Sequence, residues 1–165
     1  MGADNQQERT ETVGWVVGFV DGEGCFFVTL IRNATTRTGW QVFPEFVVTQ
    51  GQSSLAALQF LQSWFGCGAV YVNRRRDNHR EPIQRYCVRA LEDLKAKIVP
   101  FFREHPLRTK KREDFEKFAQ VIEWISEKRH LDVGGLGRIA GVAQTMNRRK
   151  SARFLLSSET IRLTP

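Results

Sequence analysis

The sequence has little cysteine and no long apolar run. Its three cysteines, Cys25, Cys67 and Cys87, include no C-x-x-C pair, so they indicate neither a disulfide framework nor a zinc site. This predicts a reducing compartment, the bacterial cytoplasm or an organelle matrix. No stretch approaches the roughly 20 apolar residues of a membrane helix, and residues 1–12 lack the apolar core of a secretory signal. We therefore expect a soluble, unsecreted protein that does not bind membranes.

Acidic residues are outnumbered. The 165 residues carry a formal net charge of +7, and the isoelectric point is near 9.8. A basic folded domain favours a polyanionic partner such as nucleic acid, although many basic proteins bind nothing specific. The length allows one domain with a substantial core. We expect a disordered tail over 1–11, a single domain over 12–150 and a C-terminal tail over 151–165.

Alternation and helical spacing predict a mixed α+β chain. We expect the first helix to begin at Glu11 or Thr12, and Pro44 to mark an edge position or a bulge in the second strand. The remaining expected elements are strands over 25–32 and 40–50, a helix from 53 or 54 to 65, strands over 69–74 and 83–89, a helix over 92–104 interrupted by Pro100, a helix over 110–129, a glycine-rich joint over 132–137 and a terminal helix over 138–150.

The stretch from Gly14 to Gly24, G-W-V-V-G-F-V-D-G-E-G, carries the most specific pattern. Gly14, Gly18 and Gly22 recur at spacing four, which on a helix places them on one stripe that another backbone can approach closely. Asp21 and Glu23 follow at the end of the run. On spacing alone, a buried strand followed by a tight turn is an equal alternative.

Residues 15–24 resemble the LAGLIDADG motif of homing endonucleases and related intron maturases. They depart from it at the first two apolar positions and in having Glu as the last acid. The expected order of elements, over roughly residues 12–129, is also that of the family. The resemblance implies an α+β, αββαββα LAGLIDADG homing endonuclease fold, with antiparallel β-hairpins forming a DNA-binding saddle and extra C-terminal helices.

The resemblance also implies a function: an intron-encoded, site-specific double-strand DNA endonuclease that hydrolyses phosphodiesters with a divalent cation. The cation would be Mg²⁺, or another such as Mn²⁺ or Ca²⁺ in crystals. Because only one motif copy is present, we expect a homodimer on a long, pseudo-palindromic target, with the glycine stripes packed together. The alternatives are a non-cleaving maturase that binds intron RNA, a DNA-binding regulator on the same fold, or a basic ribosome-associated structural protein.

By resemblance, Glu23 is the metal ligand, with the Gly22 carbonyl as a further metal contact, and Asp21 braces the helix junction at the interface. Gln50 matches a position that orders water in the active site. Lys110 and Lys111 match a basic segment that contributes a lysine near the scissile phosphate, and either could be that lysine.

Strand alternation predicts a DNA-facing surface, because a two-stranded ribbon fits the major groove. Between residues 74 and 89, six arginines stand against two acids, and arginine binds guanine and phosphate well. We expect Val70, Val72, Tyr86 and Val88 in the core. The expected DNA-binding residues are Cys25, Phe27, Thr29, Ile31, Gln41, Phe43, Glu45, Val47, Tyr71, Asn73, Arg74, Arg75, Arg76, Arg85 and Cys87, with Arg148, Arg149 and Lys150 adding backbone contacts.

Overall fold

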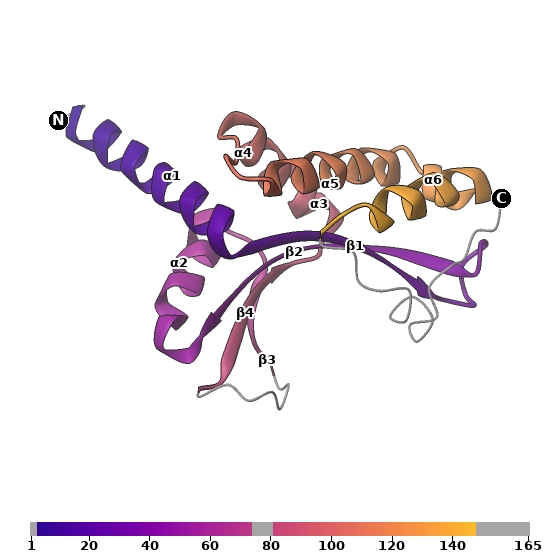
Figure 1. Cartoon of the computed structure of the whole chain (residues 1–165), viewed down its shortest axis with the longest axis horizontal. Coiled ribbons are helices and arrows are strands. Elements are labelled where there is room, and N and C mark those ends of the chain that lie inside the picture. The colour runs from indigo at the N-terminus through magenta and orange to yellow at the C-terminus, as the bar shows by residue number, and fades with distance from the viewer. Residues whose placement is uncertain (1–2, 74–80, 148–165) are drawn as a thin grey trace. The chain divides into compact units, whose positions relative to one another are not determined.

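The computed structural model describes residues 3–73 and 81–147. The predicted α+β order of a helix, two strands, a helix, two strands and further helices is confirmed (Figure 1). The elements are α1 (Ala3–Glu23), β1 (Gly24–Arg32), β2 (Trp40–Gly51), η1 (Gln52–Ser54), α2 (Leu55–Phe65), β3 (Ala69–Asn73), β4 (Ile83–Val88), α3 (Leu91–Asp93), η2 (Leu94–Ile98), α4 (Val99–Glu104), α5 (Lys111–Ser126), η3 (Arg129–Leu131) and α6 (Val133–Gln144). None of these described helices is long and apolar enough to cross a bilayer.

The four strands form one sheet in the order β1-β2-β4-β3. Strand β4 is antiparallel to both its neighbours: Tyr86 lies opposite Val48 of β2 and opposite Val70 of β3. The ladder between β2 and β4 begins at Phe46. Pro44 therefore precedes that ladder and leaves no gap in it, but β2 lies between β1 and β4, so the predicted edge position is wrong for the strand as a whole.

The chain divides into two compact units. The first takes the described residues of 1–25 and 46–112, and the second those of 26–45 and 113–165. Strand β2 and helix α5 contribute to both units, so each unit is built from segments distant in sequence. The expectation of a single folding domain stays a prediction.

The first unit is organised around Phe46. Its ring centroid lies 6.1 Å from those of Phe65 and Tyr86 and 5.8 Å from that of Phe102, in edge-on geometry that aromatic pairs favour. Helix α2 buries Leu58, Leu61 and Phe65, three residues at helical spacing. The Tyr86 hydroxyl donates to the Cys67 carbonyl at 3.0 Å, so a hydrogen bond satisfies the polar end of this buried ring.

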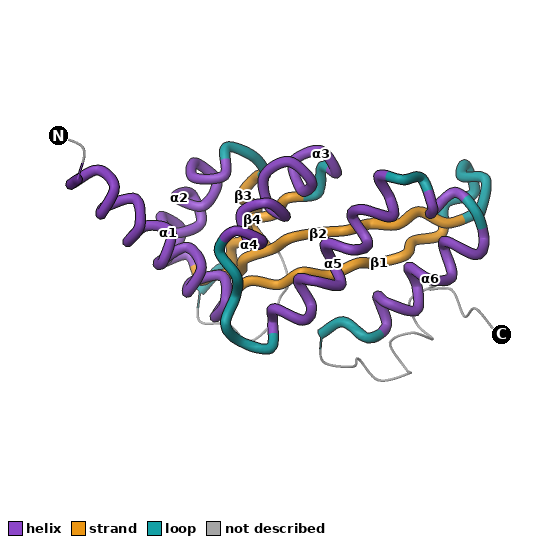
Figure 2. Tube along the Cα trace, turned by 90° about the horizontal axis from the view of Figure 1, so that it is seen from above, coloured by secondary structure: helices purple, strands orange, loops and turns teal. Residues whose placement is uncertain are grey.

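The second unit packs α5 and α6 beside strands β1 and β2 (Figure 2). The ring of Phe26 lies 5.2 Å from that of Phe115 and 5.4 Å from that of Phe118. Leu30 of β1 packs with Leu136 and Ala140 of α6. Burial of these apolar side chains holds the two helices on the strands.

Helix α1 begins earlier than predicted, and the expectation of a disordered segment over residues 3–11 is wrong. Its polar half is supported by local bonds: Gln7 Nε2 donates to Glu11 Oε1 at 3.0 Å, and the Thr10 and Thr12 hydroxyls each donate to a carbonyl four residues earlier at 2.8 Å. Helix propagation adds one backbone bond per residue once a nucleus exists. The motif half, which buries Val16 and Val20, provides that nucleus.

The predicted glycine-rich joint is wrong, because residues 133–137 form the first turns of α6. Asp132 caps this helix by accepting from the Gly135 N–H at 2.8 Å. A side chain at Gly135 would collide with the backbone carbonyl of Arg129. Glycine here permits close packing of η3 on α6 and does not interrupt the helix.

The segment 91–104 is helical throughout, and Pro100 does not interrupt it as predicted. A π-helical turn, η2, precedes the proline, and the Val99 N–H bonds to the carbonyl of Leu94, five residues earlier. Pro100 then stands in the first turn of α4, where its missing N–H costs little.

Candidate active site

The motif run is a helix up to Glu23, so the alternative of a buried strand is wrong. Val16 and Val20 are fully buried, whereas Gly14, Gly18 and Gly22 are exposed, and a β-carbon at any of the three would meet no atom within 4 Å. The glycine stripe therefore lies on a face of α1 that the described residues leave uncovered. Gly24 is different: a β-carbon there would lie 2.7 Å from the Val20 carbonyl oxygen, so the turn into β1 requires glycine.

Asp21 binds the loop that leads into α5. Its carboxylate accepts from the Arg108 N–H at 2.8 Å, the Thr109 N–H at 3.1 Å and the Thr109 hydroxyl at 2.6 Å. Burial raises the pKa of Asp21, but these bonds and the nearby charge of Lys111 outweigh it and hold the pKa below its ordinary value. Its contacts agree with the predicted bracing role, although its place in an interface stays a prediction.

Lys111 lies against the C-terminal end of α1. Its Nζ donates to the carbonyls of Val20 at 3.0 Å and Gly22 at 3.1 Å, two of the carbonyls that a helix end leaves without helical partners. Lys110 is exposed, and no bond from it to the motif is found within the described residues. The structure thus distinguishes two lysines that the sequence left equivalent.

Glu23 is the last residue of α1, and its side chain is exposed. Within residues 3–73 and 81–147 its carboxylate makes no hydrogen bond or ion pair. The negative end of the helix dipole lies beside it, which favours a cation. No group of three or more His, Cys, Asp or Glu side chains that could hold a metal exists in the described parts of the chain. A cation here would therefore combine one carboxylate with carbonyl, water or phosphate oxygens.

Gln50 lies near the end of β2, opposite Gln84. It is half-buried, and across the described segments its amide makes no hydrogen bond. Gln84 is buried, and its amide donates to the Gln52 side chain. Hydrogen bonds therefore bring Asp21, Gly22 and Lys111 together, whereas Glu23 and Gln50 are joined to them by none.

Sequence analysis missed two residues that support this site. The Thr109 hydroxyl donates to the Asp21 carboxylate and accepts from the Lys111 N–H at 3.2 Å. Glu81 accepts from the N–H and the hydroxyl of Ser53 at 2.8 and 2.9 Å, and so anchors the start of η1. Partners 88 and 28 residues apart carry no local sequence signal.

The predicted alternation of β1 is confirmed. Phe26, Val28 and Leu30 are buried, whereas the other face is partly or fully open: Cys25, Phe27, Thr29 and Ile31. In β2, Gln41 is exposed and Phe43 half-buried, but Glu45 and Val47 are only 6% and 3% exposed, so their predicted accessibility is wrong. Residues 44–48 are buried on both strand faces, as is typical of the middle of an inner strand.

On the second hairpin, Tyr71 is 50% exposed and Arg85 half-buried, on the predicted open face. The predicted accessibility of Cys87 is wrong: it is buried, and it lies between the apolar Val47 and Ala69 on the flanking strands. Val72 is wrong as a core residue, since it lies near the end of the edge strand β3 and is 57% exposed. The side chain of Asn73 and all of Arg74, Arg75, Arg76, Arg148, Arg149 and Lys150 lie outside the described residues.

Residues 16–122 match the family model described as LAGLIDADG endonuclease. The chain belongs to the LAGLIDADG endonuclease family. It is 33% identical over 135 residues to probable intron-encoded endonuclease 3 of Neurospora crassa, covering 81% of this chain and 24% of that protein. It is 31% identical over 127 residues to probable intron-encoded endonuclease 2 of the same fungus, covering 76% and 25%. The chain thus spans about a quarter of these relatives.

Solved LAGLIDADG structures share the fold. The homing endonuclease I-TnaI is 41% identical with a TM-score of 0.77, and the match covers 87% of this chain and 93% of that one. The homing endonuclease I-LtrWI, solved bound to target DNA, is 27% identical with a TM-score of 0.78, over 84% of this chain and 45% of that one. The LAGLIDADG fold predicted from the motif is confirmed.

Proposed function

We propose that this LAGLIDADG chain is a homing endonuclease that cuts both strands of a long, pseudo-palindromic DNA site as a divalent-cation-dependent homodimer. The observation that carries the proposal is the end of the motif helix. The Glu23 carboxylate, which makes no hydrogen bond or ion pair with the described residues, lies next to Gly22, whose carbonyl accepts from the Lys111 ammonium at 3.1 Å. The names of the relatives support it, and I-LtrWI was solved on its target DNA.

The residues at this helix end fit a hard divalent cation. Glu23 and the Gly22 carbonyl offer only oxygen donors, which suits Mg²⁺, Mn²⁺ or Ca²⁺. When bound, such a cation supplies an activated water and stabilises charge on phosphate. The similar endonuclease I-SmaMI, 32% identical, was solved with uncleaved DNA in the presence of calcium ions.

The chain's own residues then divide the remaining work. Lys111 places a positive charge beside the scissile phosphate, where it offsets the negative charge that builds up on the oxygens. Asp21 binds the 108–109 loop and so fixes the position of the first residue of α5, Lys111. The Gln50 amide, which has no hydrogen-bond partner among the described residues, orients a water near the attacked phosphorus.

A second copy of the chain is needed for the second strand. One motif supplies one Glu23, whereas I-LtrWI is about twice the length of the matched region. I-TnaI, which this chain covers almost completely, is similarly short. The uncovered glycine stripe lets two α1 helices approach closely, and a two-fold axis between them gives each DNA strand its own Glu23.

The open faces of the two hairpins provide the DNA contacts. Thr29, Ile31 and Gln41 on the first hairpin and Tyr71 and Arg85 on the second are accessible at least in part. Side chains on such ribbons contact base edges in the major groove. The basic excess of the chain adds phosphate contacts that raise affinity without sequence information.

The test incubates the full chain with a random-sequence DNA library and Mg²⁺ and sequences the cut ends. The expected result is one enriched site with both strands cut, and its loss in Glu23→Gln with binding to that site retained. Cutting by Glu23→Gln at the wild-type rate would refute the role of Glu23. Tight, specific binding without cutting by the wild type would favour the maturase or regulator alternative.

A further inference from the structure

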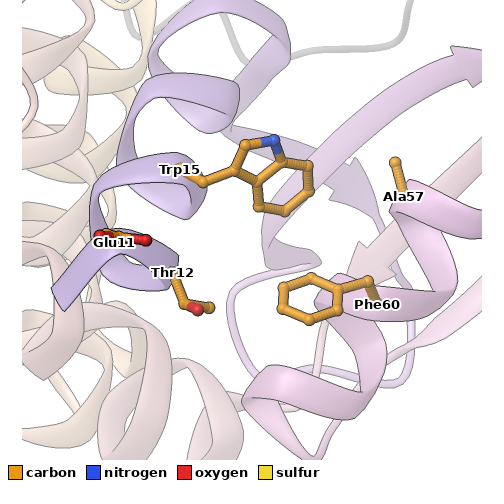
Figure 3. A pocket seen from close by; sticks show the side chains of 5 residues that line it. All are labelled: Glu11, Thr12, Trp15, Ala57 and Phe60. Carbon is orange, nitrogen blue, oxygen red and sulfur yellow. The ribbon is translucent and has the colours of Figure 1, made fainter. Parts of the chain in front are cut away.

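Residues of α1 and α2 line an apolar groove of about 400 Å³, in which the rings of Trp15 and Phe60 face each other (Figure 3). Nothing in the described parts of the chain shows what covers this groove, so it identifies no partner. The tip of the first hairpin, residues 33–39 between β1 and β2, is more informative. Hydrogen bonds there fix which polar atoms face outward, and this orientation determines what the tip can recognise.

The backbone of the tip is closed by three hydrogen bonds. The Asn33 N–H donates to the Gly39 carbonyl at 2.9 Å, the Thr36 N–H to the Asn33 carbonyl at 3.1 Å and the Gly39 N–H to the Thr36 carbonyl at 3.0 Å. Gly39 has a φ of 75°, a conformation that glycine adopts without strain. The tip is therefore preorganised, which lowers the entropy cost of binding a partner.

Gln41 lies on the open face of the hairpin. Its neighbours Trp40 and Val42 pack against the apolar cluster of β1 and α6. Successive side chains of a strand point to opposite faces, and Gln41 is exposed. Its amide therefore shares a face with Thr29 and Ile31 of β1.

The hydrogen bonds of Asn33 determine the orientation of the Gln41 amide. The Thr35 N–H and hydroxyl donate to Asn33 Oδ1 at 3.1 and 2.6 Å. Because a backbone N–H can only donate, the atom facing it must be the oxygen of Asn33, and the other branch of that amide is a donor. Asn33 Nδ2 donates to Gln41 Oε1 at 3.0 Å. The oxygen of Gln41 is thus engaged, and its Nε2 donors have no partner among the described residues.

We infer that Asn33 is a positioning residue that makes Gln41 select guanine in the DNA target. The inference rests on the proposed function, in which the open face of this hairpin contacts DNA. In the major groove guanine shows two adjacent acceptors, N7 and O6, whereas adenine shows the N7 acceptor and the N6 donor. A glutamine with a freely turning amide binds adenine with its oxygen and nitrogen together. Gln41 offers only donors, so it favours guanine, at one position of each half-site.

The test sequences the duplexes that each full-length variant retains from a random-sequence DNA library with Ca²⁺ present. Gln41→Ala identifies the position that Gln41 contacts, because base preference is lost there and kept elsewhere. In Asn33→Asp an acceptor replaces the Nδ2 donor, while Oδ1 still accepts from the Thr35 N–H, so Gln41 must turn its oxygen outward. The preference should change by roughly tenfold or more, from guanine to adenine or cytosine, whose amino groups donate.

Two further variants separate recognition from structure. Asn33→Ala releases the Gln41 amide, so adenine should be accepted beside guanine. Thr38→Val is the matched control: it removes one hydroxyl bond in the same turn, to the Trp40 carbonyl at 3.2 Å, and should keep the wild-type preference. Circular dichroism and thermal melts compare the folds. A purely structural role of Asn33 would lower the melting temperature and leave the base preference unchanged.

The outcomes distinguish this inference from the proposed function. If Asn33→Asp still selects guanine, or if Gln41→Ala changes no position, Asn33 does not control recognition. Cutting of the selected site by the wild type with Mg²⁺ would then leave the proposed function intact. If the wild type enriches no sequence, the proposed function is wrong, and the inference with it.

Discussion

Replacing Asp21 by Asn should destabilise the protein by about 2 kcal/mol. Its carboxylate accepts three close bonds, from the Arg108 N–H, the Thr109 N–H and the Thr109 hydroxyl. Asn offers one oxygen in place of two and turns an NH₂ group toward N–H donors. Hydrogen bonds to a charged group contribute roughly 1.5–3 kcal/mol each, and because Asp21 is only half-buried, water replaces part of the loss.

The pH dependence follows from the lowered pKa of Asp21. A carboxylate whose folded pKa lies below its ordinary value of 3.8 stabilises the fold above that value, and the stabilisation is lost as the pH falls through the folded pKa. The difference in unfolding free energy between the wild type and Asp21→Asn should therefore be constant near neutral pH. It should shrink once the pH falls below about 4.

Urea unfolding at one protein concentration measures the difference. With a slope of roughly 2 kcal/mol/M, the midpoint should fall by about 1 M without a change of slope. Asp132→Asn is the matched control: it weakens a single bond, to the Gly135 N–H, far from the motif in sequence. Because Asn caps a helix about as well as Asp, this substitution should change the unfolding free energy by only a few tenths of a kcal/mol and leave the cleavage rate unchanged. An Asp21→Asn protein as stable as the wild type at pH 7 would refute the bracing role of Asp21.

The remaining predictions concern the lysines and the glycines. Lys111→Met should lower single-turnover cleavage at least tenfold with little change in DNA affinity, whereas Lys110→Met should have the smaller effect on the rate; the reverse order would assign the role to Lys110. Gly18→Leu should give a monomer in sedimentation and lose double-strand cutting, and a dimeric, active variant would exclude the stripe as the interface. In α6, Gly141→Ala should raise the unfolding free energy by about 0.5–1 kcal/mol, because a β-carbon there meets nothing within 4 Å. Gly135→Ala should lower it, because the β-carbon would collide with the Arg129 backbone; equal effects in thermal melts would contradict this packing.

Periodicity was sufficient to predict most strands and helices of this chain. The buried set Phe26, Val28 and Leu30 alternates in β1, and Leu58, Leu61 and Phe65 recur in α2. The predictions failed where contacts between residues distant in sequence override a local sequence pattern. Glycines at 134, 135 and 137 resemble a linker in sequence. In the structure they belong to α6, which Asp132 caps, and the backbone of Arg129 in η3 approaches Gly135 too closely for a side chain.

Accessibility was predictable for the outer strand β1 and less so further into the sheet. Alternation assumes that one strand face is open, and this holds for Thr29 and Ile31. It fails for Val47 and Cys87, which lie opposite each other on two strands that each have neighbours on both sides. The order β1-β2-β4-β3 decides which strands are inner, and no pattern within a single strand contains that order.

The candidate site shows the same division. The motif places Asp21, Gly22 and Glu23 at a helix end, and this needed only the sequence. The choice of Lys111 over its neighbour depends on how the 105–110 loop returns to α1. The Asp21–Thr109 bond fixes that return, and its partners are 88 residues apart.

The division of labour between the two acids follows from helix geometry. Successive residues turn by about 100°, so Asp21 and Glu23 point about 200° apart around α1. One side chain can face the 108–109 loop only if the other faces away from it. The Asp21 carboxylate accepts three hydrogen bonds from this loop. Glu23 makes none with the described residues and lies at the negative end of the helix. The spacing D-G-E therefore leaves one carboxylate bonded to the loop and one exposed, and the carbonyl of the glycine between them accepts from Lys111.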